Sequence, residues 1–167
     1  MADLAPQERL LPFLLDRLTD EDPATRLESR EKRVVSFRQF HKAILRDLTW
    51  LLNTASKANI SELNEFPEVM KSVINYGMPD LTGMTESNTN PDTIERIVKN
   101  AILQYEPRIT RNALQVRAVD STKSVNNVLS VEIRGEVWAQ PMPESLYVKT
   151  EVDLETGMCN LTDQLHG

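Results

Sequence analysis

The chain has 167 residues, of which 40% are hydrophobic and 26% charged, with five glycines and nine prolines, which is the composition of one ordinary globular domain. Its net charge of −6 has the wrong sign for a free-standing nucleic-acid-binding protein. No apolar run approaches the roughly 20 residues of a membrane span, and the N-terminal residues lack a signal-peptide pattern, so we expect no membrane insertion.

The first predicted element is a short amphipathic segment near the N-terminus. Its leucines recur at helical spacing: Leu10, Leu11, Leu14, Leu15 and Leu18. Pro12 is tolerable there only near a helix start, and residues 20–23 end the segment. The leucines either lie on the protein's own core or form an arm on another subunit. We therefore divide the chain into an N-terminal arm of residues 1–33, which can be flexible, and a single α+β domain of residues 34–167.

A stronger helix is predicted over residues 36–53. Ser36 with Gln39 makes a capping box, and Val35 and Phe40 are spaced for a hydrophobic staple. The apolar stripe that follows contains Phe37, Phe40, Ile44, Leu48, Leu51 and Leu52. Trp50 lies off this stripe, so it is either an interface anchor or a partly buried core residue.

Residues 54–93 form mainly a connection, with a short helix opening at Phe66 and Pro67 and a turn in which Gly77 can take a positive φ. A second long helix is predicted over residues 90–105. Asn90 is its N-cap, and Pro107 ends it because proline pushes the preceding residue out of the helical region.

After this helix the apolar period changes from 3.6 to 2, which predicts three strands over residues 114–118, 129–137 and 146–154. Glu155, Thr156 and Gly157 look like a hairpin turn into a short fourth strand. The fold class that follows is α+β, with N-terminal amphipathic helices packed on one face of a small antiparallel sheet of three to four strands.

Charge is distributed unevenly along this order of elements. Residues 26–46 carry seven basic residues and two acids, whereas residues 132–163 carry seven acids and two basic residues. Two solvated faces explain this pattern, and so do two docking surfaces of opposite sign; the sequence leaves both open.

Residues that carry chemistry are scarce. The single cysteine, Cys159, excludes an internal disulfide framework and suits a reducing compartment, so we expect a cytoplasmic location; we also expect Cys159 to be a strand residue rather than a nucleophile. His41 and His166 have no metal-ligand spacing. No phosphate loop or nucleophile elbow is present, and we expect no catalytic residue, metal or cofactor.

One short segment stands out, Glu106-Pro107-Arg108 at the corner between the second long helix and the first strand. It is either a local device, in which Arg108 neutralises the helix end and pairs with Glu106, or a rigid corner that presents a charged pair to a partner. If Arg108 is an exposed docking charge, Arg108→Glu should leave the fold nearly intact.

Four segments, in the right order, resemble a known family. They are Glu106-Pro107-Arg108, residues 15–18 with the Asp-Pro that follows, residues 45–54, and residues 73–83. Together they resemble the phage-tail baseplate wedge family once labelled lysozyme-like, in its type VI secretion branch. The resemblance covers about residues 10–161.

This resemblance implies a non-enzymatic α+β subunit in the baseplate of a contractile injection machine, at the cytoplasmic face of the inner membrane. It implies association with the baseplate proteins TssF, TssG and TssK, and a template for the sheath proteins TssB and TssC. Glu106, Pro107 and Arg108 would form the baseplate-docking corner, and residues 129–137 and 146–154, with whatever sheet edge they leave unpaired, would meet the sheath. Ala55 stands where the family often has a basic residue.

The family's old label suggests a rival function, peptidoglycan hydrolysis. A glycosidase needs two carboxylates, one of them held protonated. Glu106 is the natural candidate for the acid, but the neighbouring Arg108 favours its ionised form, and the sequence marks no second carboxylate. We therefore expect an assembly subunit rather than a hydrolase.

Overall fold

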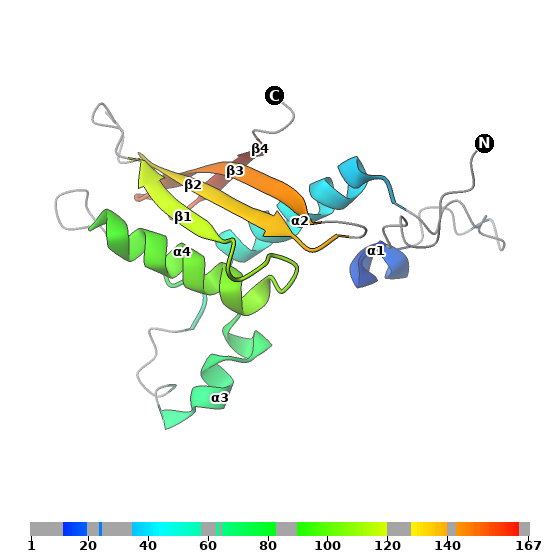
Figure 1. Ribbon diagram of the computed structural model, residues 1–167. Helices are drawn as coiled ribbons and strands as arrows, with labels where there is room; N and C mark the ends of the chain where they lie inside the picture. Colours follow the sequence, from blue (N-terminus) through cyan, green and yellow to red (C-terminus); the bar gives the residue numbers. More distant parts are fainter. Residues whose placement is uncertain are drawn as a thin grey trace.

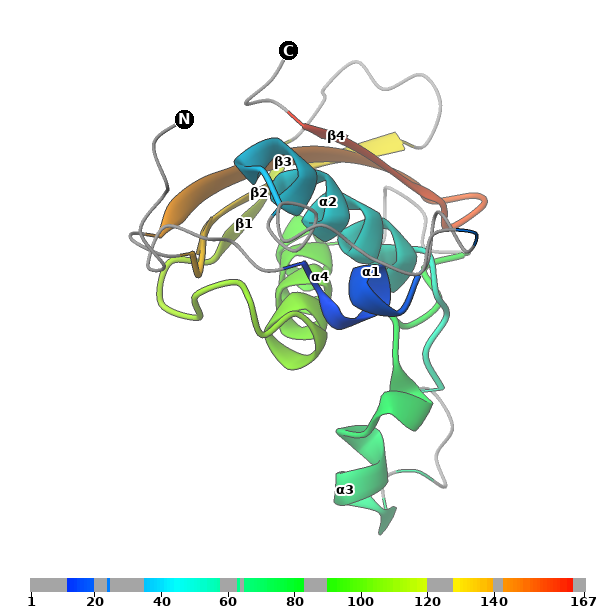
Figure 2. The same ribbon diagram turned by 90° about the vertical axis from the view of Figure 1, so that its right-hand side faces the viewer.

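The computed structural model describes residues 12–19, 24, 35–57, 63, 65–82, 90–119, 128–139 and 143–163. Two long helices, α2 (Phe37–Leu52) and α4 (Pro91–Tyr105), accompany a four-stranded sheet. Figures 1 and 2 show both helices on the same face of that sheet. The predicted α+β class is confirmed.

The sheet is antiparallel throughout, in the order β1 (Gln115–Val119), β2 (Val128–Val137), β3 (Glu144–Asp153) and β4 (Cys159–Asp163). The predicted alternation is confirmed, because inward residues of the strands are less exposed than their neighbours, and in β3 every second residue from Leu146 to Val152 is buried. The fully buried members of this inner face include Val131, Ile133, Val148 and Val152. Gly157, in the predicted hairpin turn between β3 and β4, has φ +71°.

Helix α2 begins as the sequence predicts. The Ser36 hydroxyl accepts the Gln39 backbone N–H, and the Gln39 side chain accepts the Ser36 backbone N–H, which completes the capping box. Its buried face contains Phe40, Ala43, Ile44, Leu48, Leu51 and Leu52. Val35 packs against the same core. Trp50 is half exposed and lies beside the guanidinium of Arg46.

Helix α4 also has its predicted ends. The Asn90 side chain accepts the backbone N–H of Asp92, Pro91 occupies the first turn, and Glu106 is the C-cap. Ile94, Val98 and Ile102 are completely buried on the side that faces the sheet. The helix therefore delivers Glu106 to the edge of the core.

The connection between α2 and α4 projects from the body (Figures 1 and 2). It contains the short helix α3 (Pro67–Met70) and the 3₁₀ turn η4 (Val73–Asn75). Gly77 returns the chain to the body with φ +119°, as predicted, and a Cβ there would lie 2.1 Å from the Thr54 carbonyl oxygen. This turn accordingly requires glycine.

Helix α1 (Leu14–Leu18) lies beside α2. Leu14 and Leu18 are 70% and 74% exposed, so these two leucines do not join the core, and Phe13 packs there instead. Leu10 and Leu11 lie outside the described residues, as does most of the predicted arm of residues 1–33.

Candidate functional site

The Glu106-Pro107-Arg108 corner is tied to the sheet by backbone hydrogen bonds. Trp138 donates its N–H to the Arg108 carbonyl at 2.8 Å, and Thr110 donates to the Glu136 carbonyl at 2.8 Å. Ile109 thereby forms an isolated antiparallel bridge with Val137 at the end of β2. The helix end, the corner and the second strand thus hold one another in place.

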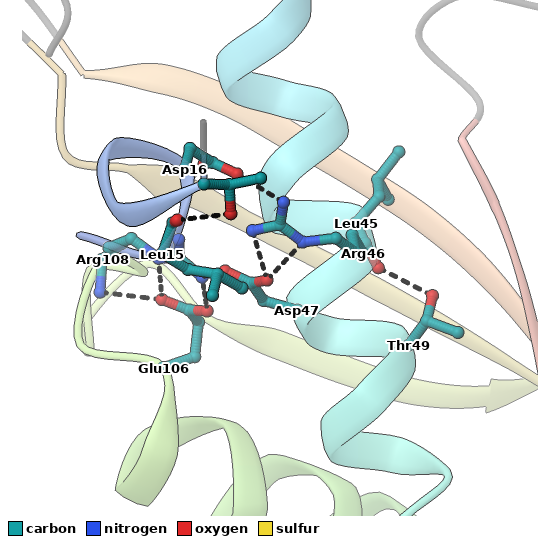
Figure 3. Close-up of polar contacts among 9 residues, drawn as sticks. Leu15, Asp16, Leu45, Arg46, Asp47, Thr49, Glu106 and Arg108 are labelled. Atoms are coloured by element: carbon teal, nitrogen blue, oxygen red, sulfur yellow. Dashed lines mark hydrogen bonds and ion pairs between the residues drawn. The ribbon is translucent and has the colours of Figure 1, made fainter. Parts of the chain in front are cut away.

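The two charged side chains of the corner face inward and toward each other (Figure 3). The guanidinium of Arg108 binds both carboxylate oxygens of Glu106, one through Nε and the other through Nη2. The Arg108 backbone N–H adds a bond of 3.2 Å to Glu106 Oε1. Glu106 is only 4% exposed and the Arg108 side chain 20% exposed. This bidentate geometry is the strong form of a charged pair.

Asp47 in the middle of α2 gives Arg108 a second carboxylate. Arg108 Nη2 lies 2.8 Å from Asp47 Oδ2. Burial by itself lowers the pKa of Arg108, but the hydrogen bonds and charges of Glu106 and Asp47 outweigh it, so the pKa lies above its ordinary value. Arg108 is therefore a fixed cation that links the C-terminus of α4 to α2.

The network continues from Asp47 to helix α1. Arg46 Nε donates to Asp47 Oδ1 at 2.9 Å, and Arg46 Nη1 forms an ion pair with Asp16 (Figure 3). The Phe13 ring covers the Arg108 guanidinium at 4.1 Å from its centroid and packs against Phe40 at 4.8 Å. Three segments far apart in the sequence thus meet around one arginine.

Two tyrosines join this cluster to the projecting connection. The Tyr105 hydroxyl donates to the Asn75 carbonyl at 2.7 Å, and its ring meets Tyr76 edge-on at 5.2 Å. Burial first, and then the charges of Asp47 and Glu106, raise the pKa of Tyr76 above its ordinary value. The base of the connection is therefore fixed beside the charged cluster.

Of the two alternatives that the sequence left open for the corner, the structure favours the local pair, because Glu106 and Arg108 bind each other and both charges are largely buried. An Arg108→Glu chain would place a third carboxylate between Glu106 and Asp47, so that substitution would not leave the fold nearly intact. Of the three corner residues, Pro107 has the exposed side chain.

Sequence reasoning missed Phe13, Asp16, Arg46 and Asp47 as members of this cluster. Arg46 and Asp47 lie within a segment that carries the family resemblance, and this was the available signal. Nothing in the local sequence shows that Asp47 meets a residue 61 positions away.

The other reactive side chains are held in structural roles. Burial raises the pKa of the Cys159 thiol to about 11, which leaves little thiolate near neutral pH. His41 Nδ1 lies 3.0 Å from Asp163 Oδ2 and joins α2 to β4. In the described ranges, no group of three His, Cys, Asp or Glu side chains is placed to hold a metal ion.

Within those same ranges, no helix has both the length and the apolar character needed to cross a membrane. Both long helices instead present one apolar face to the sheet and one polar face outward.

Comparisons with known proteins place these features in a family context. The family model described as baseplate wedge protein gp25 matches residues 38–142, which is more than half of the chain and includes the corner. A search of curated proteins gave no match. Among solved structures, the chain is similar to one from "The baseplate complex from the type VI secretion system", with 21% sequence identity and a TM-score of 0.44. That match covers 69% of this chain and 95% of the other.

Proposed function

Because this chain belongs to the gp25 baseplate wedge family, we propose that it fills the position of TssE, the wedge subunit of a type VI secretion baseplate. In this role it associates with TssF, TssG and TssK at the cytoplasmic face of the inner membrane. The family membership and the four resembling segments support this assignment. Ala55, which stands where a basic residue is frequent, lies in an isolated parallel bridge with Met78.

The observation that carries the docking proposal is the buried charged cluster behind an exposed proline. Glu106, Arg108 and Asp47 join α4 to α2, while the backbone of the corner is bonded to the end of β2. Pro107 removes further freedom from that corner. A surface fixed on both sides loses little entropy on binding. We therefore assign Pro107 to the contact itself, and Glu106 and Arg108 to holding it.

The sheath-template role rests on the edges of the sheet. Strands β2 and β3 are flanked on both sides, so a strand from another chain must add to β1 or β4. Both edges are partly occupied by side chains: Asn53 bonds the N–H and carbonyl of Cys159, and Glu95 accepts the Ala118 N–H. We therefore assign the sheath contact to the edge strands β1 and β4, and not to residues 129–137 and 146–154, which lie in the two inner strands.

A non-enzymatic role agrees with the contacts that the Glu106 carboxylate makes. Both of its oxygens are bound by Arg108, which also binds Asp47. Both carboxylates are thus engaged by one arginine, whereas the two carboxylates of a glycosidase flank the bond that is cleaved. A purified sample that cleared cell-wall sheets and lost this activity on Glu106→Gln would favour the hydrolase instead.

Co-purification of the full chain with TssF, TssG and TssK tests the docking proposal. The informative variant is Pro107→Asp, which places a charge on the exposed part of the corner and leaves the Glu106–Arg108 pair in place. Asn100→Asp adds the same charge at an exposed position of α4 and is the matched control.

We expect Pro107→Asp to reduce recovery of the complex, while Asn100→Asp behaves as the wild type and both keep its circular dichroism spectrum. A complete Pro107→Asp complex would move the interface elsewhere, first to the exposed leucines of α1. Failure of the wild type to bind any of the three proteins would overturn the assignment.

A further inference from the structure

The face of the sheet that points away from the helices carries a group of hydrogen-bond donors. Alternation along the strands puts Gln115 and Arg117 of β1 beside Glu132 and Arg134 of β2 on this outer face. These four side chains line a shallow hollow. The register places Arg117 directly opposite Glu132 and Gln115 directly opposite Arg134.

One of the two arginines is held in a fixed direction. Arg134 Nη2 lies 2.9 Å from Glu132 Oε2, and the guanidinium lies over the Tyr147 ring at 4.7 Å from its centroid. An arginine has five N–H donors in a planar fork, and one carboxylate leaves several of them unused. Arg134 is 59% exposed, so those donors face the solvent above the hollow.

Among the described residues, no carboxylate is paired with either of the neighbouring cations, Arg117 and Lys149. Arg117 is exposed, and Lys149 faces Glu132 from β3. Within the described ranges, neither side chain makes a hydrogen bond or an ion pair. Glu132 thus stands between three cations and is already bound by one of them. The centre of the outer face is positive on a chain whose net charge is −6.

The surroundings restrict what this centre can bind. Three further carboxylates on the outer face, Glu136, Glu151 and Asp153, lie toward its ends. They repel a long polyanion such as a nucleic acid, as does the net charge of the whole chain. A small free anion on so open a face stays hydrated. Isolated carboxylates on a protein segment fit the remaining space, because other contacts of that segment add to the charged ones.

We propose that the hollow over β1 and β2 is an interaction surface for an acidic segment of another protein, with Arg117 and Arg134 as its carboxylate-binding residues and Gln115 and Lys149 as supporting donors. This surface lies on the outer face of the sheet, whereas the corner packs against α1 and α2. The inference does not rest on the proposed baseplate role.

Titration of the full chain, followed by amide and arginine side-chain NMR signals, tests this surface. The probe is a synthetic peptide of alternating threonine and glutamate, and its threonine–glutamine counterpart is the uncharged control. Inorganic phosphate and a short oligothymidylate are the other anions. Arg117→Glu is the test variant, because this substitution breaks no described side-chain hydrogen bond or ion pair. Arg96→Glu makes the same charge change at an exposed position of α4. This helix lies on the opposite face of the sheet from the outer face (Figure 1).

We expect the glutamate peptide to shift the signals of Arg117 and Arg134, and Arg117→Glu to weaken its binding about tenfold, while Arg96→Glu stays within about twofold of the wild type. The inference is overturned if the peptide shifts no signal on β1 or β2, or if both variants weaken it equally, which would show an effect of net charge alone. Phosphate or oligothymidylate binding as tightly as the peptide would also overturn it.

Discussion

In the part of the chain that the structure describes, two Glu-x-Arg pairs have the same spacing, Glu106 with Arg108 and Glu132 with Arg134, and the fold treats them differently. In both, the arginine binds the glutamate two residues before it. In both, the guanidinium also lies over an aromatic ring, Phe13 in one and Tyr147 in the other. The first glutamate is 4% exposed and the second 23%, and their arginines are 20% and 59% exposed.

The difference between the two pairs comes from what surrounds them. At the corner, Asp47 supplies a second carboxylate and Phe13 excludes water from the guanidinium. On the sheet, the pair lies at the surface, where water screens the attraction and competes for every hydrogen bond. Local spacing therefore makes the pair, while burial decides how much of the fold depends on it.

The largest expected effect is the removal of the buried cation. Arg108→Leu leaves Glu106 and Asp47 without their shared partner, and we expect it to lower the free energy of unfolding by about 3 kcal/mol. Chemical denaturation followed by circular dichroism measures this. Arg134→Leu is the matched change on the sheet and should leave the unfolding midpoint near that of the wild type. Equal losses in both variants would contradict the comparison.

A smaller effect is expected when only the charge of the buried glutamate is removed. Glu106→Gln keeps the shape and one acceptor, while Arg108 retains Asp47, so we expect a loss of about 2 kcal/mol in the same denaturation experiment. Glu132→Gln is the control and should change the midpoint little. If Glu106→Gln is as stable as the wild type, the corner pair does not stabilise the fold.

The aromatic covers of the two arginines distinguish the regions further. Phe13→Ala removes the ring that lies over Arg108 and against Phe40, for which we expect a loss of about 1 kcal/mol. Hydrogen exchange on α1 should rise in the same variant, because Phe13 and Asp16 are its described attachments to α2 and the corner. Unchanged exchange would show that the ring does not hold α1 in place.

The smallest expected effect is the difference between the two ion pairs in how salt changes their coupling energies. Double-mutant cycles on Glu106 with Arg108 and on Glu132 with Arg134 measure each coupling at low salt and near 1 M salt. We expect the coupling at the sheet to vanish at high salt, because surface pairs are screened over about 3 Å there. The coupling at the corner should persist. Parallel decay of both would mean that water reaches the corner freely.

Much of the fold could be predicted from local patterns. The capping box at Ser36 and the cap at Asn90 placed the starts of α2 and α4, because a cap depends on residues within one turn. Gly77 was predicted to take a positive φ, and the approach of the Thr54 carbonyl oxygen explains why glycine stands there. The strands followed from a period of two.

The candidate site was only partly predictable. The sequence indicated Glu106, Pro107 and Arg108 as a corner, but it left open whether their charges face a partner or the protein. The inward direction depends on Asp47 and Phe13, which come from other elements of the fold. The leucines of the N-terminal segment also show that spacing does not predict burial. Leu14 and Leu18 have helical spacing and yet are exposed.

The sequence by itself determined the elements, the caps and turns between them, the α+β class and the family resemblance, since these depend on neighbouring residues and their period. Only the tertiary structure decided which of two identically spaced ion pairs is buried, and which cations gather over β1 and β2. Both outcomes depend on whether segments far apart in the sequence meet in space and exclude water from a charge. Local patterns in the sequence do not show which distant segments meet.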